Sequence, residues 1–243
     1  MIKKVIITAI LLVYTFQIDA QNWWSNKRVK GNGNVITDIR TTGDFDGISA
    51  GGFFDVVLVK GKEGEITIEG EENLLEYIET KVSRGILKIQ VEKGINLKTT
   101  RNLLITVPIE DIESVSLAGS GNLRSKTIIN SNDLQANLGG SGNIILDISV
   151  KNLESSIGGS GNIKLSGEAD YMRSSIAGSG TIKAYQLQVN EIKASIAGSG
   201  DIRVSVNDEI DASVAGSGNV YYKGNPAKIN SKSVGSGSVR SIN

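Results

Sequence analysis

The side chains that could do acid–base chemistry in this chain are carboxylates, because its 243 residues include no histidine and no cysteine. Imidazole-based triads, thiol nucleophiles and imidazole or thiolate metal sites are therefore excluded. Cleavage of a polysaccharide by paired carboxylates needs two of them within several ångströms of each other. The tighter acidic groups lie in turn-like sequence that favours solvated carboxylates: Asp44 and Asp46, and Asp208, Glu209 and Asp211. We predict a protein that is not an enzyme and has no catalytic residue; a polysaccharide-cleaving enzyme that uses Asp44, Asp46 and Asp201 is the less favoured alternative.

Three basic residues have a spacing that could bind an acidic ligand. Lys164, Lys183 and Arg203 each lie five residues beyond the first glycine of a Gly-Ser-Gly triplet. Equal offsets predict side chains that stack on the outward face of one sheet. Such a stripe could bind an acidic glycan, although a run of charges is more often a solvated surface. These three residues are the candidate ligand face.

The glycine-rich triplets also suggest a phosphate cradle or calcium sites, and both are disfavoured. A phosphate cradle needs a helix N-terminus after the glycines, but each triplet leads into strand-like sequence. Calcium prefers several carboxylates at each site, and only one residue that follows a triplet, Asp201, is acidic. We therefore predict no metal and no cofactor. The residues after the triplets are instead expected to form a ladder between repeats, beside a stack of the triplet serines: Asn122, Asn143, Asn162, Thr181, Asp201, Asn219 and Ser238.

The element that must position these columns is a repeat of 18 to 21 residues. The Gly-Ser-Gly triplets begin at Gly119, Gly140, Gly159, Gly178, Gly198, Gly216 and Gly235. A period this short is typical of a solenoid, in which each repeat stacks on the previous one and cannot bury its apolar face alone. Glycine suits the corner because it adopts positive φ without a Cβ clash.

Aliphatic residues recur two and six residues before the triplets, except at Ser233 and Glu113, and four residues after the first glycine of every triplet. Examples are Ile157, Leu153 and Ile163 around the triplet at Gly159. Positions two apart share this character, which is strand periodicity. Each repeat is expected to contain two short strands, a Gly-Ser-Gly corner and a looser second turn, such as residues 166–168.

These patterns predict an all-β, right-handed parallel β-helix with about 19–20 residues per rung and a less regular N-terminal part. At roughly 4.8 Å per rung, seven rungs would extend about 30 Å. A left-handed hexapeptide helix is the structural alternative, but it would place an aliphatic residue at every sixth position.

The N-terminal segments are assigned by composition. Residues 1–20 resemble an export signal, with Lys3 and Lys4 before an apolar stretch and Ala20 at the expected cleavage point. Residues 21–34, which include Trp23 and Trp24, are a tether or cap. Residues 35–110 are a diverged β-helical part. Within residues 21–110, the stretches 30–35 and 48–52 are expected to be altered rungs, and 73–80 a helical turn or loop. Residues 111–243 are the repeat region.

Charge limits the partners. Without residues 1–20 the chain would carry 24 basic and 25 acidic residues, a net charge of −1. This near-neutral charge predicts no binding to nucleic acid. The apolar stretch of the signal is too short to span a bilayer and no comparable stretch follows it, so the mature chain is not expected to span a membrane.

Three stretches resemble a known family. They are Phe45–Val56 (Phe-Asp-Gly-Ile-Ser-Ala-Gly-Gly-Phe-Phe-Asp-Val), Gly85–Ile89, and the iterated Gly-Ser-Gly-Asn-Ile. They are similar to the bacterial putative auto-transporter adhesin family with the head GIN domain, over about residues 35–243. The resemblance implies an exported β-helical protein of Gram-negative bacteria with a surface or adhesive role. It assigns no catalytic or binding residue.

The prediction is an exported, non-enzymatic cell-envelope protein, in the periplasm or at the cell surface, that presents a repetitive face to a glycan or to an envelope or host protein. The alternative is an architectural component whose end rungs pair with another copy to form a homo-oligomer.

Overall fold

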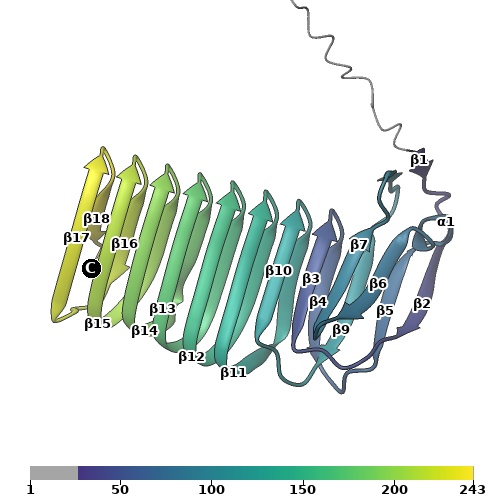
Figure 1. Ribbon diagram of the computed structural model, residues 1–243, viewed down its shortest axis with the longest axis horizontal. Coiled ribbons are helices and arrows are strands. Elements are labelled where there is room, and N and C mark those ends of the chain that lie inside the picture. The colour runs from purple at the N-terminus through teal and green to yellow at the C-terminus, as the bar shows by residue number, and fades with distance from the viewer. Residues whose placement is uncertain (1–26, 243) are drawn as a thin grey trace, which may run out of the picture.

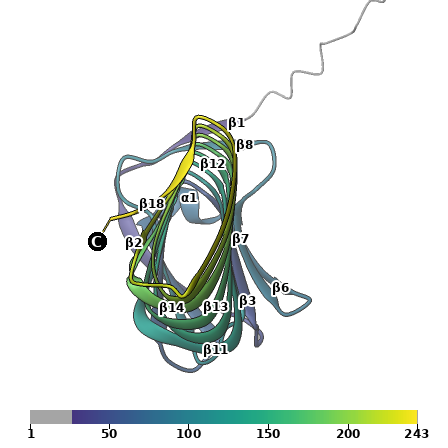
Figure 2. The same ribbon diagram turned by 90° about the vertical axis from the view of Figure 1, so that its left-hand side faces the viewer.

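The computed structural model describes residues 27–242 and is a parallel β-solenoid of about seven turns. In Figure 1 the strands lie side by side along one axis, and the view along that axis in Figure 2 shows a flattened tube. The coil is right-handed in both views. This architecture confirms the predicted right-handed parallel β-helix with a less regular N-terminal part.

Each complete turn of the repeat region is one long strand that runs from one corner to the next. The parallel ladder is in register at every corner, so that Gly140 pairs with Gly159 and Gly159 with Gly178. The strands are β10 (Ser114–Gly119), β11 (Asn122–Gly140), β12 (Asn143–Gly159), β13 (Asn162–Gly178), β14 (Thr181–Gly198), β15 (Asp201–Gly216), β16 (Asn219–Lys223), β17 (Lys228–Gly235) and β18 (Ser238–Ser241).

Both glycines of each triplet are required by the stacking of the corners. The first has φ between +115° and +137°, which side chains rarely adopt. The third has no such φ, but a Cβ on Gly180 would lie 2.5 Å from the carbonyl oxygen of Gly161 in the preceding turn. The predicted hydroxyl stack is not present among the described residues. The corner serines are joined through the backbone instead: the N–H groups of Ser160 and Gly161 donate to the Gly140 carbonyl at 2.9 and 3.1 Å.

The second bend absorbs the differences in repeat length. The prediction of two short strands per repeat is wrong, because this bend does not interrupt the strand: Gly167, with φ of +107°, lies inside β13. The register between neighbouring turns shifts near this bend, between Arg124 and Ile128 of β11 and between Ala184 and Gln188 of β14. The corners stay aligned because length varies only at the opposite side of the coil.

The predicted aliphatic columns form one continuous core. Ile157, Leu153 and Ile163 are no more than 2% exposed, and so are their counterparts in the neighbouring turns. At the C-terminal end the columns reach the surface, where Ile229 of β17 is 43% exposed. The polar residues Ser231, Lys232 and Ser233 also lie on this exposed strand.

The N-terminal turns are stacked out of sequence order. β3 (Gly47–Gly52) and β4 (Asp55–Lys60) form a turn that pairs with β10 and β11, so residues 48–52 are an altered rung, as predicted. β7 (Ile86–Val91) pairs with the other edge of β3, and β9 (Leu104–Ile109) with the other edge of β4. The later segment of the chain therefore forms the outer turn.

Antiparallel strands cap this outer turn. β6 (Ile78–Ser83) pairs with β7, and β5 (Glu65–Glu71) pairs with β9 and β2 (Val35–Thr41). Helix α1 (Glu72–Leu75) buries Leu74 and Leu75, so the predicted helical turn is present but packs against the core. A further pair joins β1 (Lys27–Lys30) and β8 (Ile95–Lys98).

The prediction that residues 30–35 form a rung is wrong. This segment passes from β1 into the antiparallel strand β2, and its glycines bring the chain close to the buried Glu71. The carboxylate of Glu71 accepts hydrogen bonds from the Gly33 and Thr100 N–H groups at 2.7 Å each, and from the Thr100 hydroxyl at 2.6 Å. Residues 30–35 therefore form a loop around the Glu71 carboxylate, where a corner of the coil was expected.

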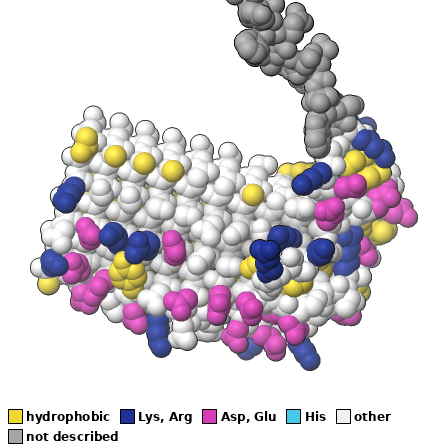
Figure 3. All heavy atoms as spheres, viewed as in Figure 1, with side chains coloured by type: hydrophobic (Ala, Val, Ile, Leu, Met, Phe, Trp, Pro, Cys, Tyr) yellow, Lys and Arg dark blue, Asp and Glu magenta, His cyan; other side chains and the backbone are white. Residues whose placement is uncertain are grey.

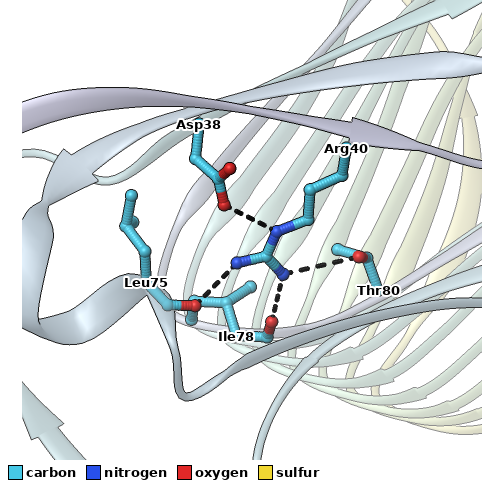
Figure 4. Close-up of polar contacts among 5 residues, drawn as sticks. All are labelled: Asp38, Arg40, Leu75, Ile78 and Thr80. Atoms are coloured by element: carbon cyan, nitrogen blue, oxygen red, sulfur yellow. Dashed lines mark hydrogen bonds and ion pairs between the residues drawn. The ribbon is translucent and has the colours of Figure 1, made fainter.

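Arg40 makes several polar contacts at the same end of the coil (Figure 4). Its guanidinium donates to the carbonyls of Leu75, at 2.7 Å, and Ile78, and it pairs with Asp38 at 2.8 Å. These contacts use carbonyl groups that the ends of α1 and β6 would otherwise leave unpaired. The Arg40 guanidinium therefore provides hydrogen-bond donors for these backbone carbonyls where the hydrophobic column ends.

The predicted signal segment 1–20, Trp23 and Trp24 lie outside the described residues, and the predicted domain boundaries stay predictions. At the other end, β17 pairs only with β15 and β18 only with β16 among residues 27–242. The proposed pairing of end rungs with another copy also stays a prediction.

Candidate functional site

The predicted basic residues lie on the wall that follows the corners. Lys164 pairs in register with Lys183, and Lys183 with Arg203, so the three side chains stack one above another as expected. Lys164 and Lys183 are exposed, because alternate residues of these strands point outward. Their use as a ligand face stays a prediction.

A shallow groove of about 280 Å³ runs beside this column. Arg124, Lys164 and Lys183 supply three positive charges, and Asp55 supplies one negative charge. The exposed side chain of Ile145 lies in register between Arg124 and Lys164 and gives the groove an apolar patch. The lining residues are Asp55, Val56, Asn122, Arg124, Asn143, Ile144, Ile145, Asn162, Lys164 and Lys183.

An amide ladder forms one side of the groove and confirms the predicted asparagine column. The Asn143 amide donates to the Asn122 side-chain oxygen at 2.8 Å, and the Asn162 amide donates to Asn143 at 3.1 Å. The ladder begins one turn earlier than predicted, because Asn122 donates to Asp55 at 2.8 Å. Hydrogen bonds along the column hold the polar side chains in fixed orientations along the groove.

The environment of Arg203 differs from that of Lys164 and Lys183. Its guanidinium pairs with Asp201 at 3.5 Å and lies 5.8 Å from the centre of the Tyr221 ring. It does not line the groove. Its charge is therefore largely balanced within the protein, whereas Arg124 takes part in the groove.

Sequence reasoning missed Arg124 and Asp55. Arg124 has the same offset from Gly119 as Lys164 has from Gly159, so the signal was present. Ile145 interrupts the column between them and hid the relationship. Asp55 follows Gly52, whose corner lacks the serine and the third glycine of the triplet.

The carboxylates considered for catalysis are not brought together. Asp46 precedes β3, whereas Asp201 begins β15, five turns or about 24 Å away along the axis. Paired-carboxylate hydrolysis uses separations of about 5–10 Å. In the other acidic group, Glu209 pairs with Lys228 at 2.7 Å and Asp211 with Lys193 at 3.9 Å. These are surface ion pairs on strand β15, whereas the sequence had suggested solvated carboxylates in a turn.

Asp44 and Asp46 have one notable neighbour, Glu63. Burial, followed by the negative charges of Asp44 and Asp46, raises the pKa of Glu63, although an N–H donated by Phe45 at 2.8 Å opposes the shift. Over residues 27–242 no group of three or more acidic side chains is arranged to hold a metal ion. Nor does any helix in that range have the length and apolarity needed to cross a bilayer.

The opposite wall, which runs into the corners, differs in character. Figure 3 shows that its upper part carries small uncharged side chains, while charged groups lie lower down. Examples are Ala177 and Ser175 near the corner, and Arg173 farther from it. The basic groove is therefore confined to one side of the coil.

Three solved structures share this fold. A putative adhesin from Bacteroides fragilis is 24% identical, with a TM-score of 0.82, over 88% of this chain and 100% of that chain. A putative lipid binding protein from Parabacteroides distasonis is 29% identical, with a TM-score of 0.75, over 89% of this chain and 100% of that chain. A putative adhesin from Parabacteroides merdae is 26% identical, with a TM-score of 0.71, over the same shares of 89% and 100%.

No curated protein matches the chain significantly. One family does match it, over residues 44–226, and is described as the putative auto-transporter adhesin, head GIN domain. The match includes the turn of β3 and β4, the cap apart from β2, and most of the repeat region. The chain therefore belongs to the putative auto-transporter adhesin family with the head GIN domain.

Proposed function

We propose that the protein is an exported, non-enzymatic component of the cell envelope that binds an acidic glycan in the groove beside Lys164 and Lys183. The observation that carries the proposal is the charge of the groove, which places three cations and one carboxylate around about 280 Å³. Lysine and arginine bind carboxylates and sulfates through charge-assisted hydrogen bonds. Membership of an adhesin family supports attachment to a partner as its role.

The repeat geometry favours an extended ligand. Lys164 and Lys183 lie one turn apart, about 4.8 Å, and Arg124 lies two turns before Lys164. A glycan with regularly spaced acidic groups can contact several turns at once. Asn143 and Asn162 add amide groups that can bond to its hydroxyls.

The test is a titration calorimetry experiment with a galacturonate hexamer as the acidic probe. We expect saturable binding that weakens at least tenfold in the variant Lys164→Ala/Lys183→Ala, because two charged contacts are lost. Raising the salt concentration should also weaken binding, since the groove is open to solvent. Lys193→Ala, which removes an exposed lysine from the opposite wall, is the matched control and should bind normally.

Three results would contradict the proposal. The first is no binding to the acidic hexamer, and the second is binding that the double lysine variant leaves unchanged. The third is a preference for vesicles of anionic lipid over the hexamer. The vesicle arm is included because one similar structure is named a putative lipid binding protein.

A further inference from the structure

A second hollow lies at the bend opposite the corners, away from the basic groove. Its volume is about 610 Å³, within the range of clefts that hold small ligands. It crosses strands β11 to β15, so it follows the axis of the coil over several turns. Its lining residues are Asn130, Ser131, Asn132, Ser149, Val150, Lys151, Glu168, Ala169, Asp170, Gln188, Asn190 and Asn207.

The hollow is lined by rows of side chains that hydrogen bond from turn to turn. The hydroxyl of Ser149 donates to Glu168 at 2.7 Å. In the next row Asn190 donates to Asp170 at 3.2 Å, and Asn207 donates to Asn190 at 3.0 Å. These contacts orient the groups but leave much of their capacity free, because a carboxylate has about four acceptor sites and an amide both donates and accepts.

The charge of the hollow argues against an anionic ligand. Glu168 and Asp170 outnumber the single cation, Lys151. Figure 3 shows that acidic side chains gather along the lower edge, where this bend lies. The floor offers no apolar patch either, because Val150 and Ala169 are only 7% and 4% exposed. A hard cation is also unsuited, since no group of three acidic side chains within residues 27–242 is arranged to hold a metal ion.

From this geometry we infer that the hollow binds a neutral oligosaccharide that lies along the axis of the coil. Sugar hydroxyls donate and accept hydrogen bonds, so they match a lining that mixes amides, hydroxyls and carboxylates. Gln188 lies in register with Glu168, and Glu168 with Ser149, so one polar group recurs with each turn of about 4.8 Å. That repeat is close to the length of one pyranose ring in an extended glycan.

A neighbouring hollow supports the same ligand class. It has a volume of about 210 Å³ and contains the half-buried ring of Tyr171 beside Asn152, Glu154 and Arg173. Tyr171 directly follows Asp170, and Asn152 directly follows Lys151, so the two hollows adjoin at this bend. A tyrosine ring offers an apolar face with a polar tip, which suits the C–H face of a sugar ring next to its hydroxyls.

The experiment measures binding of the mature protein to neutral hexasaccharides of glucose, mannose and N-acetylglucosamine, with the galacturonate hexamer for comparison. We expect saturable binding to at least one neutral hexamer. Gln188→Ala and Asn190→Ala should each weaken it about tenfold, the change expected when a ligand hydrogen bond is lost. Gln186→Ala is the matched control, because Gln186 is exposed on the same strand but does not line the hollow. Thermal unfolding monitored by circular dichroism verifies that each variant is folded.

The outcomes separate this site from the basic groove. The Lys164→Ala/Lys183→Ala variant should bind the neutral hexamer normally, even though it loses the acidic one. The inference is overturned if no neutral hexamer binds at millimolar concentration, or if Gln186→Ala weakens binding as much as Gln188→Ala. It is also overturned if the lysine variant loses the neutral ligand, which would place that ligand in the basic groove.

Discussion

Two buried serines show how closely each inward position is matched between turns. Ser155 and Ser174 are both 0% exposed, and their hydroxyl oxygens lie 2.9 Å apart in adjacent turns. The turns on either side place Ala136 and Ala194 in the same column. The two hydroxyls therefore form a self-contained pair, with an alanine on either side of it in the column.

Because the two hydroxyls bond to each other, we predict that replacing one serine destabilises the protein more than replacing both. Ser174→Ala leaves the Ser155 hydroxyl buried without a partner and should lower the free energy of unfolding by roughly 1–3 kcal/mol. Ser155→Ala/Ser174→Ala removes both groups and should lie within about 1 kcal/mol of the wild type, because alanine already fits this column. Urea unfolding of the two single variants and the double variant measures the difference. A double variant less stable than either single variant would show that the pair is not the relevant unit.

Within each corner, the distance between the backbones of successive turns limits which side chains can fit. The third glycine of a triplet has an ordinary φ, so intrinsic conformational preference would allow alanine there. The neighbouring turn would not, because the added Cβ of Gly180 lies 2.5 Å from the Gly161 carbonyl oxygen. Contacts closer than about 3 Å must be relieved by moving the backbone.

We therefore predict opposite effects for two Gly→Ala substitutions. Gly180→Ala should lower the free energy of unfolding by about 2 kcal/mol or more, since overpacking shifts a rigid ladder. Gly158→Ala should be neutral or stabilising by up to about 1 kcal/mol, because a Cβ there meets nothing within 4 Å and alanine reduces the entropy of the unfolded chain. Ala177 already occupies the equivalent position of the next turn. Equal losses in the two variants, measured by thermal unfolding, would refute this account of the corner.

The repeat elements could be predicted from sequence because every turn supplies the same signal. The glycine triplets, the aliphatic columns and the asparagine ladder all recur at matching offsets, and the structure places them in register. Ile145 breaks the basic column, and this one irregularity was enough to hide Arg124. The hollow at the opposite bend gave no comparable signal, because Ser149, Glu168 and Gln188 share one offset from the following corner but differ in chemical type.

The N-terminal elements could be predicted only as strands. Alternating or apolar sequence at 53–59, 65–68, 86–91 and 103–107 coincides with strands β4, β5, β7 and β9, with small differences at their ends. Their spatial order was beyond sequence reasoning, because β3 accepts β7 on one edge and β10 on the other. Glycine-rich sequence at 30–35 was misleading because glycine serves a close approach to Glu71 there, as well as it serves a corner elsewhere.

For the whole molecule, the two ends of the coil are protected differently. The N-terminal end is covered by antiparallel strands, α1 and the Arg40 contacts, whereas the last strands at the C-terminal side expose one edge within the described residues. The stability of the covered end depends on the Glu71 carboxylate. Burial alone would raise the pKa of Glu71, but the hydrogen bonds from Thr100, Gly33 and Arg101 outweigh it and lower the pKa to about 2.

This shift predicts that acid weakens the cap. A lowered pKa means that the folded state favours the ionised form, so the stabilisation is complete above the unfolded value near 4.5 and is lost as the pH falls toward 2. Glu71→Gln should therefore reduce stability by roughly 1–3 kcal/mol near neutral pH and by much less at pH 2. Thermal unfolding between pH 2 and pH 7 measures this, with Glu69→Gln on the exposed side of β5 as the control. Parallel curves for Glu71→Gln and the wild type across this range would contradict the assignment.

The in-register corners have a consequence for how such chains can change in length. Each turn touches only its two neighbours, so inserting or deleting one whole repeat leaves every remaining contact type intact. A gene duplication of about nineteen codons would lengthen the coil by one turn and leave the capped N-terminal end unchanged. Because both proposed ligand surfaces extend across several turns, the same event would also alter the length of polymer that the coil could bind.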